Sequence, residues 1–235
     1  MQNRRDFLKT AAFAALGSGV VINDVFGGES APKLFNINKS GVNARMKLRF
    51  FPYELKLRHV FTVATYSRTT TPDVQVEIEY DGVIGYGEAS MPPYLQKELG
   101  TMESVLAFLK KVQDIIGQFS DPFQLEDILA YVDKLSPGDA AAKAAVDIAI
   151  YDLFAQMCNL PLYKLLGGYR TNIKSDLTIS LREPEIMAQD AIEAVNNGYT
   201  DLKIKVGNDS ALDFKRIIAI RNAVGNEINI RLDAN

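Results

Sequence analysis

The sequence predicts an α+β domain followed by the beginning of a parallel α/β sheet, and two observations carry this prediction. Alternating strands with a tight turn, and then helices, occupy about residues 46–165. From about residue 172 the order becomes strand, helix, strand, helix, strand, which is typical of βαβ units. The chain has 235 residues, 47% of them hydrophobic, enough for one or two domains with a sizeable core.

Composition excludes several classes of function. The net charge is -3 and the Lys and Arg residues are scattered, so nucleic acid is not an expected partner. The single cysteine, Cys158, excludes an internal disulfide and a cysteine-based zinc site. The single histidine, His59, excludes a histidine-rich metal site. A bound metal would need carboxylate ligands, which favour a hard ion such as Mg²⁺.

The N-terminus, residues 1–27, is expected to be a signal peptide. Arg4 and Arg5 precede an apolar run over residues 11–22, which is too short to span a bilayer. The order Arg-Arg-Asp-Phe-Leu-Lys resembles a twin-arginine signal, and an amphipathic helix is the alternative. Residues 28–45 are expected to form a linker. Export predicts a periplasmic or cell-envelope location.

The first domain is expected to begin with strands. Residues 46–58 alternate well enough to predict a strand, whereas residues 60–71 are polar and threonine-rich and are expected to form a loop. Residues 72–90 predict two further strands around a hairpin turn at Asp81-Gly82. One face of the first of these two strands carries Val74, Val76 and Ile78.

Three helices are expected next. Thr101 is the predicted N-cap of a helix over residues 102–117, and Asp121-Pro122 is expected to begin the second, with proline in the first helical position. The third helix is predicted over residues 138–158, before a glycine stop at "LLGG". One of its faces is composed mostly of small residues, which predicts close packing: Ala141, Ala145, Ile148, Ala149 and Asp152.

The last part of the chain is expected to place charge on one face of a parallel sheet. In the predicted strand 201–206 alternate residues are apolar, which leaves Lys203 and Lys205 together on the opposite face. Asp233 ends the next predicted strand, 228–233, on the corresponding face. In a (β/α)8 barrel the carboxyl end of that face holds the active site, and in an open sheet it borders the ligand crevice. A solvated edge strand is the alternative.

Four motifs in this order resemble the enolase superfamily, in its muconate-lactonising subgroup. They are "GVIGYGEAS", "AAKAAVDIAIYDLFAQMCNLPLYKLLGG", "LKIKVG" and "RLDAN". The resemblance covers residues 46–235. It implies an α+β capping domain over 46–165, followed over 166–235 by the first three βα units of a TIM (β/α)8 barrel that is incomplete in this chain.

The resemblance also implies the chemistry. Members bind a substrate carboxylate on Mg²⁺ and remove the proton α to it. Lys205 would be the general base, and Lys203 would lower the pKa of Lys205 and steady the developing oxyanion. Asp233 would be a magnesium ligand, with Asn235 close to it.

The substrate implied is a small molecule, an Ala-Glu dipeptide. Arg68 resembles the arginine with which dipeptide epimerases hold a glutamate side-chain carboxylate, and simple solvation is the alternative. Thr178 and Ser180, at the end of the first barrel strand, are candidates for lining the pocket or for ordinary barrel packing.

The chain also departs from the family pattern. It ends two residues after Asp233, before the further metal carboxylates and the opposing lysine that the family carries. A truncated chain without epimerase activity is therefore expected. A homo-oligomer is a possible state of the full-length family form. Other reactions of the superfamily (cycloisomerase, N-acylamino-acid racemase, dehydratase) and a non-catalytic remnant remain open.

Overall fold

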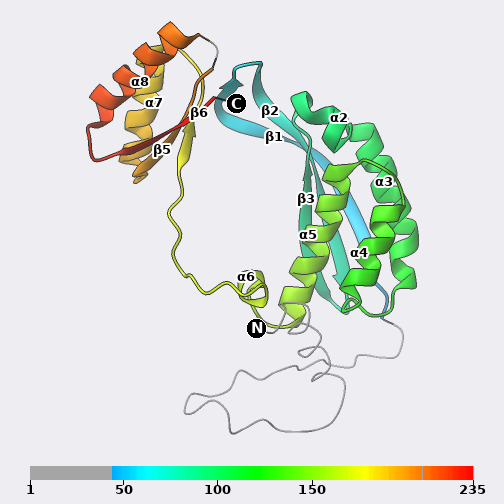
Figure 1. Cartoon of the computed structure of the whole chain (residues 1–235). Helices are drawn as coiled ribbons and strands as arrows, with labels where there is room; N and C mark the ends of the chain where they lie inside the picture. Colours follow the sequence, from blue (N-terminus) through cyan, green and yellow to red (C-terminus); the bar gives the residue numbers. More distant parts are fainter. Residues whose placement is uncertain (1–43, 208, 235) are drawn as a thin grey trace, which may run out of the picture.

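The structure is a computed structural model that describes residues 44–207 and 209–234 (Figure 1). The predicted signal peptide and most of the predicted linker lie outside these residues, as does Asn235. Within the described ranges, no helix has the length and apolar character needed to cross a membrane.

The first sheet is an antiparallel meander of β1 (Lys47–Val63), β2 (Tyr66–Tyr80) and β3 (Val83–Ser90), in that order. The predicted turn at Asp81-Gly82 is confirmed. Both residues have positive φ, 51° and 79°, as a two-residue hairpin turn of this kind requires. The predicted apolar face is also confirmed: Val74, Val76 and Ile78 are fully buried.

The prediction of a loop over residues 60–71 is wrong. β1 and β2 run through this segment and are joined by a turn at residues 64–65, so that Phe61 pairs with Arg68 and Val63 with Tyr66. Threonine is β-branched and favours strands, and this preference outweighs its polarity here. The threonine-rich segment is therefore the tip of a long hairpin.

Helices cover the buried face of this sheet (Figure 1). The Thr101 cap is confirmed, because its side chain accepts a hydrogen bond from Ser104 N at the start of α3. The predicted helix start at Pro122 is wrong. Asp121 instead accepts a hydrogen bond from Phe123 N at 2.8 Å, which makes a turn, and α4 begins at Leu125. The helices of this domain are η1 (Pro93–Leu95), α2 (Gln96–Leu99), α3 (Met102–Ile115), η2 (Ile116–Gln118), α4 (Leu125–Lys134), α5 (Ala140–Met157) and α6 (Leu162–Leu165).

The small-residue face of α5 packs directly on the sheet, as predicted. Ala145 and Ala149 are fully buried, and their backbones face the glycines of β3. Asp152 completes the contact by accepting a hydrogen bond from Tyr86 N at 2.9 Å. Ile148, which was expected on the same face, is 48% exposed and does not belong to it.

The second sheet is parallel, with β4 (Leu177–Ile179), β5 (Asp201–Lys205) and β6 (Asn229–Asp233) in that order. The helices α7 (Pro184–Asn196) and α8 (Ser210–Val224) connect these strands and lie on one side of the sheet (Figure 1). The predicted three βα units are thus present as three strands and two helices among the described residues. A separate small core lies under the helices and includes Met187, Ala191, Leu202, Ile204 and Ile220.

Candidate active site

The polar cluster predicted at the carboxyl ends of β5 and β6 is present. The strand register places Lys205 directly opposite Asp233, two residues beyond the pair Lys203 and Arg231. Both lysine Nζ atoms reach the same atom, Asp233 Oδ2, at 2.7 Å from Lys203 and 2.8 Å from Lys205. The carboxylate therefore lies between two ammonium groups that would otherwise repel each other.

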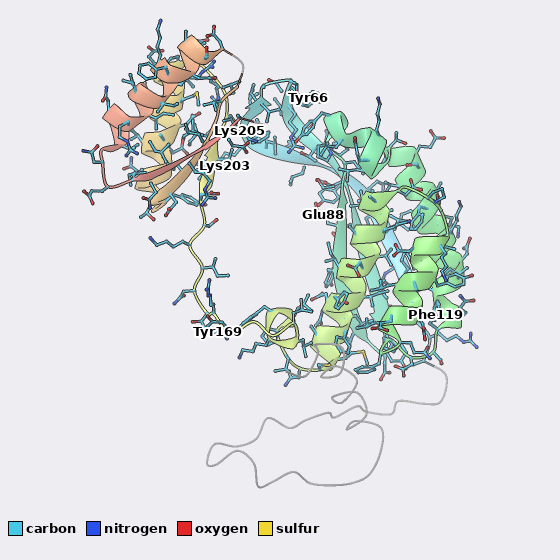
Figure 2. All side chains as sticks on the ribbon, in the orientation of Figure 1. Tyr66, Glu88, Phe119, Tyr169, Lys203 and Lys205 are labelled. Carbon is cyan, nitrogen blue, oxygen red and sulfur yellow. The ribbon has the colours of Figure 1, made fainter. Side chains whose placement is uncertain are left out.

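The two lysines differ in exposure. Alternation along β5 buries Leu202 and Ile204 completely under the helices, so that both lysines occupy the opposite face. The side chain of Lys205 is 11% exposed and that of Lys203 is 33% exposed. Figure 2 shows both on β5, with Lys205 at the end of the sheet nearer to the β1–β2 hairpin. Lys205 is the more enclosed amine, which suits a group that must exchange a proton with a bound molecule.

The tip of the β1–β2 hairpin reaches across to the second sheet (Figure 1). Leu181 N, just beyond β4, donates a hydrogen bond to Thr62 O at 3.0 Å. Arg58 forms an ion pair with Glu193 on α7 at 2.9 Å. Thr62 thereby fixes the capping hairpin just beyond the carboxyl end of β4, and Arg58 fixes it on α7.

Arg68 lies on this hairpin in an aromatic setting. Its guanidinium carbon is 5.4 Å from the ring centre of Phe61 and 5.9 Å from that of Tyr94. Tyr94 also packs against Tyr66, with ring centres 5.3 Å apart. Arg68 Nε and Nη1 are buried without a hydrogen-bond partner. Such donors are rarely left unsatisfied, so this arrangement is suited to an anionic ligand.

Thr178 lies on β4, the edge strand of the second sheet, and Ser180 directly follows this strand. Thr178 pairs with Lys203 across β4 and β5, and Ser180 is buried. Both line a cavity of about 410 Å³, together with Arg58 and other residues of the hairpin and α7. The described lining of this cavity does not include the two lysines, so Thr178 borders both features whereas the cavity is not the lysine cluster itself.

A magnesium site is not complete among the described residues. Mg²⁺ requires a near-octahedral set of oxygen ligands. Asp233 has the right chemistry for one ligand, but one of its oxygens is shared by two ammonium groups. In the described part of the chain, no group of three or more Asp, Glu, His or Cys side chains is arranged to hold a metal. The residues present do not by themselves fit the ion.

The sequence did not indicate two parts of the site. The Phe61 ring beside Arg68 was missed because residues 60–71 were interpreted as a loop; the β-branched content of that segment was the available signal. Tyr94 lies outside that segment, and no local pattern links it to Arg68. A buried pair on α8, Asp213 and Arg216, was also missed. Its signal was weak, because charged residues three apart on a helix are usually solvated.

Together these features define a class: an antiparallel capping domain whose hairpin covers the carboxyl ends of parallel strands that carry a lysine pair and a carboxylate. Residues 46–167 match the family described as mandelate racemase / muconate lactonizing enzyme, N-terminal domain, and residues 186–235 match the enolase C-terminal domain-like family. The chain belongs to this family of the enolase superfamily, and its second sheet is the beginning of the barrel domain.

Several proteins similar to this chain are dipeptide epimerases. An L-Ala-D/L-Glu epimerase of Bacteroides thetaiotaomicron is 56% identical over 236 residues, which is 100% of this chain and 59% of that protein. The dipeptide epimerase of Enterococcus faecalis, in a crystal structure with Mg and L-Leu-L-Tyr, is similar with a TM-score of 0.75 and 40% identity over 81% of this chain. The structure of a substrate-liganded complex of the L-Ala-D/L-Glu epimerase of Bacillus subtilis is similar with a TM-score of 0.74 and 38% identity over 81% of this chain. The chain spans between 53% and 59% of the length of these relatives.

Proposed function

We propose that this chain carries the capping domain and the first catalytic strands of a dipeptide epimerase acting on L-Ala-L-Glu or a close analogue. The observation that carries the proposal is the Lys203–Asp233–Lys205 cluster at the strand ends, on a chain that is 56% identical to an L-Ala-D/L-Glu epimerase. The reaction is inversion at the carbon α to the terminal carboxylate.

Lys205 is the proposed base. In its uncharged form Lys205 Nζ takes the proton from the α-carbon, and the electron pair of the broken C–H bond moves into the neighbouring carboxylate. Lys203, more exposed and on the same face, supplies positive charge to the resulting oxyanion. Asp233 holds both amines in place before the substrate enters. These are roles for this chain's own residues, and no step through a metal is derived.

Arg68 is the proposed specificity residue. Its buried, unpartnered donors and the flanking rings form a cationic socket that suits a carboxylate carried on a side chain. A charge-assisted hydrogen bond contributes about 1.5–3 kcal/mol, which corresponds to roughly a 10- to 150-fold preference. This favours glutamate over a neutral residue of similar shape at the second position of the dipeptide.

The 235-residue chain alone is proposed to be inactive and to bind Mg²⁺ weakly, because the described residues supply one carboxylate at the site. Turnover of L-Ala-L-Glu by the purified chain, or a clear rise in its melting temperature on adding millimolar Mg²⁺, would contradict this. The roles proposed for Lys203 and Asp233 in an incomplete site would then be wrong.

The function itself is tested on a completed chain, defined as this chain joined after Asn235 to the part of the Bacteroides thetaiotaomicron epimerase that follows the matched segment. The completed chain is expected to exchange the α-proton of L-Ala-L-Glu for deuterium in D₂O, which ¹H NMR follows. It is also expected to change the optical rotation of the dipeptide solution. Lys205→Met should lower epimerisation about 10²- to 10⁴-fold, the usual contribution of a general base.

Two controls make this test specific. Lys215→Met removes an exposed lysine from α8 and should leave the rate unchanged. Arg68→Met should lower kcat/KM for L-Ala-L-Glu at least about tenfold and leave that for L-Ala-L-Gln nearly unchanged. A folded completed chain that exchanges no α-proton would refute the epimerase proposal. Elimination of water or lactonisation in its place would favour another reaction of the superfamily.

We also propose that residues 1–27 direct export, on the twin-arginine order at Arg4 and Arg5. A fusion of residues 1–45 to a folded reporter should reach the periplasm, and replacing both arginines by lysine should retain it in the cytoplasm. Periplasmic delivery of the lysine variant would count against a twin-arginine route.

A further inference from the structure

A second polar cluster lies behind the strand ends that carry the lysines. Asp213 and Arg216, in the first turns of α8, are 8% and 4% exposed. Arg216 Nη1 donates to Asp213 Oδ1 at 2.8 Å, which makes a buried ion pair. Neither the predicted base nor the predicted substrate contacts account for this pair.

The pair has two outward arms, each of which ends on the backbone beyond a strand. Gly207 N, two residues after Lys205, donates to Asp213 Oδ2 at 2.8 Å. Arg216 Nε donates to Arg182 O at 2.6 Å, on the segment that follows β4. The ion pair therefore ties the end of β5 to the end of β4.

The end of β6 is held by the same segment. Val206 N donates to Asp233 O at 3.0 Å. Gly207 has a φ of +113°, and a Cβ there would lie 2.6 Å from Ala234 O, so only glycine allows this approach. The backbone at 206–207 is thus fixed from one side by Asp213 and from the other by the strand that presents the carboxylate.

A buried ion pair is weak evidence for stability, because apolar residues of similar volume often stabilise a protein equally well. What this ion pair contributes is orientation, because each of its two outward hydrogen bonds fixes one backbone group. We propose that Asp213 and Arg216 are positioning residues that hold Lys205 and Asp233 in the geometry for proton transfer. This inference rests on the proposed epimerase function.

The consequence is a loss of rate without a loss of fold. Proton transfer requires the base within hydrogen-bond reach of the α-proton, and a displacement of about 1 Å can cost about 100-fold in rate. The double variant Asp213→Leu/Arg216→Met replaces the ion pair with apolar side chains of similar length. It should retain the melting temperature within a few degrees while removing both arms.

In the completed chain, the double variant is expected to lower kcat about 10- to 100-fold with KM changed less than about twofold. Deuterium exchange provides a sharper measurement. Lys205→Met first identifies which isomer of the dipeptide depends on Lys205 for exchange. The double variant should slow exchange of that isomer at least five times more than exchange of the other isomer, whereas a merely structural pair would slow both alike.

The conservative variant and a matched control complete the kinetic test. Asp213→Asn keeps an acceptor for Gly207 N, so this variant should retain most of the wild-type kcat that the double variant loses. Asp114→Asn removes an exposed ion pair of the capping domain, Lys110 with Asp114 at 2.7 Å on α3, and should leave kcat within about twofold. Equal slowing of both isomers, or an unchanged kcat in the double variant, would overturn the inference even though the completed chain is active.

A measurement on the 235-residue chain does not depend on activity. Amide hydrogen exchange at Gly207 should accelerate at least tenfold in Asp213→Leu/Arg216→Met, while amides in the centre of α7 and α8 keep their protection. If Gly207 exchanges at the wild-type rate, the pair does not fix the end of β5 and the inference fails. If the completed chain lacks activity but exchange at Gly207 accelerates in the double variant, the proposed function fails, whereas the ion pair is still shown to fix the end of β5.

Discussion

Asp73 is a buried carboxyl group whose surroundings oppose its charge. It is 1% exposed, and its Oδ1 has no hydrogen-bond partner. Burial is the largest influence and raises its pKa; Glu88 raises it further, whereas a hydrogen bond with Ser90 and the nearby charge of Arg68 lower it. Glu88 also accepts a hydrogen bond from Tyr53, which is the main reason that the pKa of Tyr53 is raised to about 12.

The variant Asp73→Asn should therefore stabilise the protein at neutral pH. Because the folded-state pKa of Asp73 is raised, its favourable contribution is fully present below the unfolded value near 3.8 and is lost as the pH rises through the folded value. The asparagine side chain carries no charge, so we expect a gain in stability at neutral pH that shrinks in acid. Melting temperatures measured from acid to neutral pH test this expectation.

Asp201 provides a control of opposite sign. Its hydrogen bonds with Thr200 and Asn229 lower its pKa, so its contribution is present above the unfolded pKa and lost as the pH falls through the folded one. Asp201→Asn should lower the melting temperature at neutral pH and have less effect in acid. A gain from Asp73→Asn that is the same at every pH would show that charge is not the cause.

The cluster of Lys203, Lys205 and Asp233 shows which features of a site can be predicted from sequence and which cannot. Strand alternation alone placed Lys203 and Lys205 on one face, and the parallel order brought Asp233 to the same end. The sharing of one carboxylate oxygen could not be predicted, because it depends on the register of β5 against β6 and on two long side chains. Their catalytic roles stay predictions.

At the scale of elements, β3 and α5 approach each other closely through backbone atoms. A Cβ on Gly87 would lie 2.0 Å from Ala145 O, and one on Gly85 would lie 2.1 Å from Ala149 O. Backbone atoms cannot yield as a flexible side chain can. The two glycines and the two alanines therefore set the distance between helix and sheet.

Gly87→Ala should destabilise the capping domain by at least about 3 kcal/mol, the upper end of the cost of overpacking. Urea unfolding followed by circular dichroism measures the change. Gly117→Ala is the matched control: a Cβ there meets only Met46 O at 3.4 Å, and we expect less than about 1 kcal/mol. Equal effects of the two variants would mean that the loss of glycine, and not the close contact, is responsible.

The elements predicted well have a local cause, whereas the error over residues 60–71 has a non-local one. The Thr101 cap and the Asp81-Gly82 turn depend on a few adjacent residues, so their chemistry is visible in the sequence. The hairpin tip over residues 60–71 depends on pairing between strands and on the rings around Arg68. Sequence polarity was therefore misleading at the segment that places the proposed specificity residue.

At the scale of the molecule, the described chain has two hydrophobic cores without a shared residue. One lies between the antiparallel sheet and its helices and the other between the parallel sheet and α7 and α8. An extended segment over residues 166–176 joins them, and its large side chains Tyr169 and Ile173 are 82% and 84% exposed. The hairpin tip provides further contacts through Thr62 and Arg58. The two cores are thus linked mainly by polar interactions.

This organisation predicts that the two parts of the 235-residue chain unfold separately. Ile78→Ala and Ile204→Ala each remove a fully buried side chain, one from each core, and should cost about 2–5 kcal/mol in their own part. Hydrogen exchange followed by mass spectrometry should show faster exchange over residues 201–206 in Ile204→Ala, with residues 74–90 changed less than about twofold. Ile78→Ala should give the reverse pattern. Acceleration of both segments by either substitution would mean that the contacts of the hairpin tip couple the two cores into one cooperative unit, because a shared unfolding transition transmits a loss at one site to every amide.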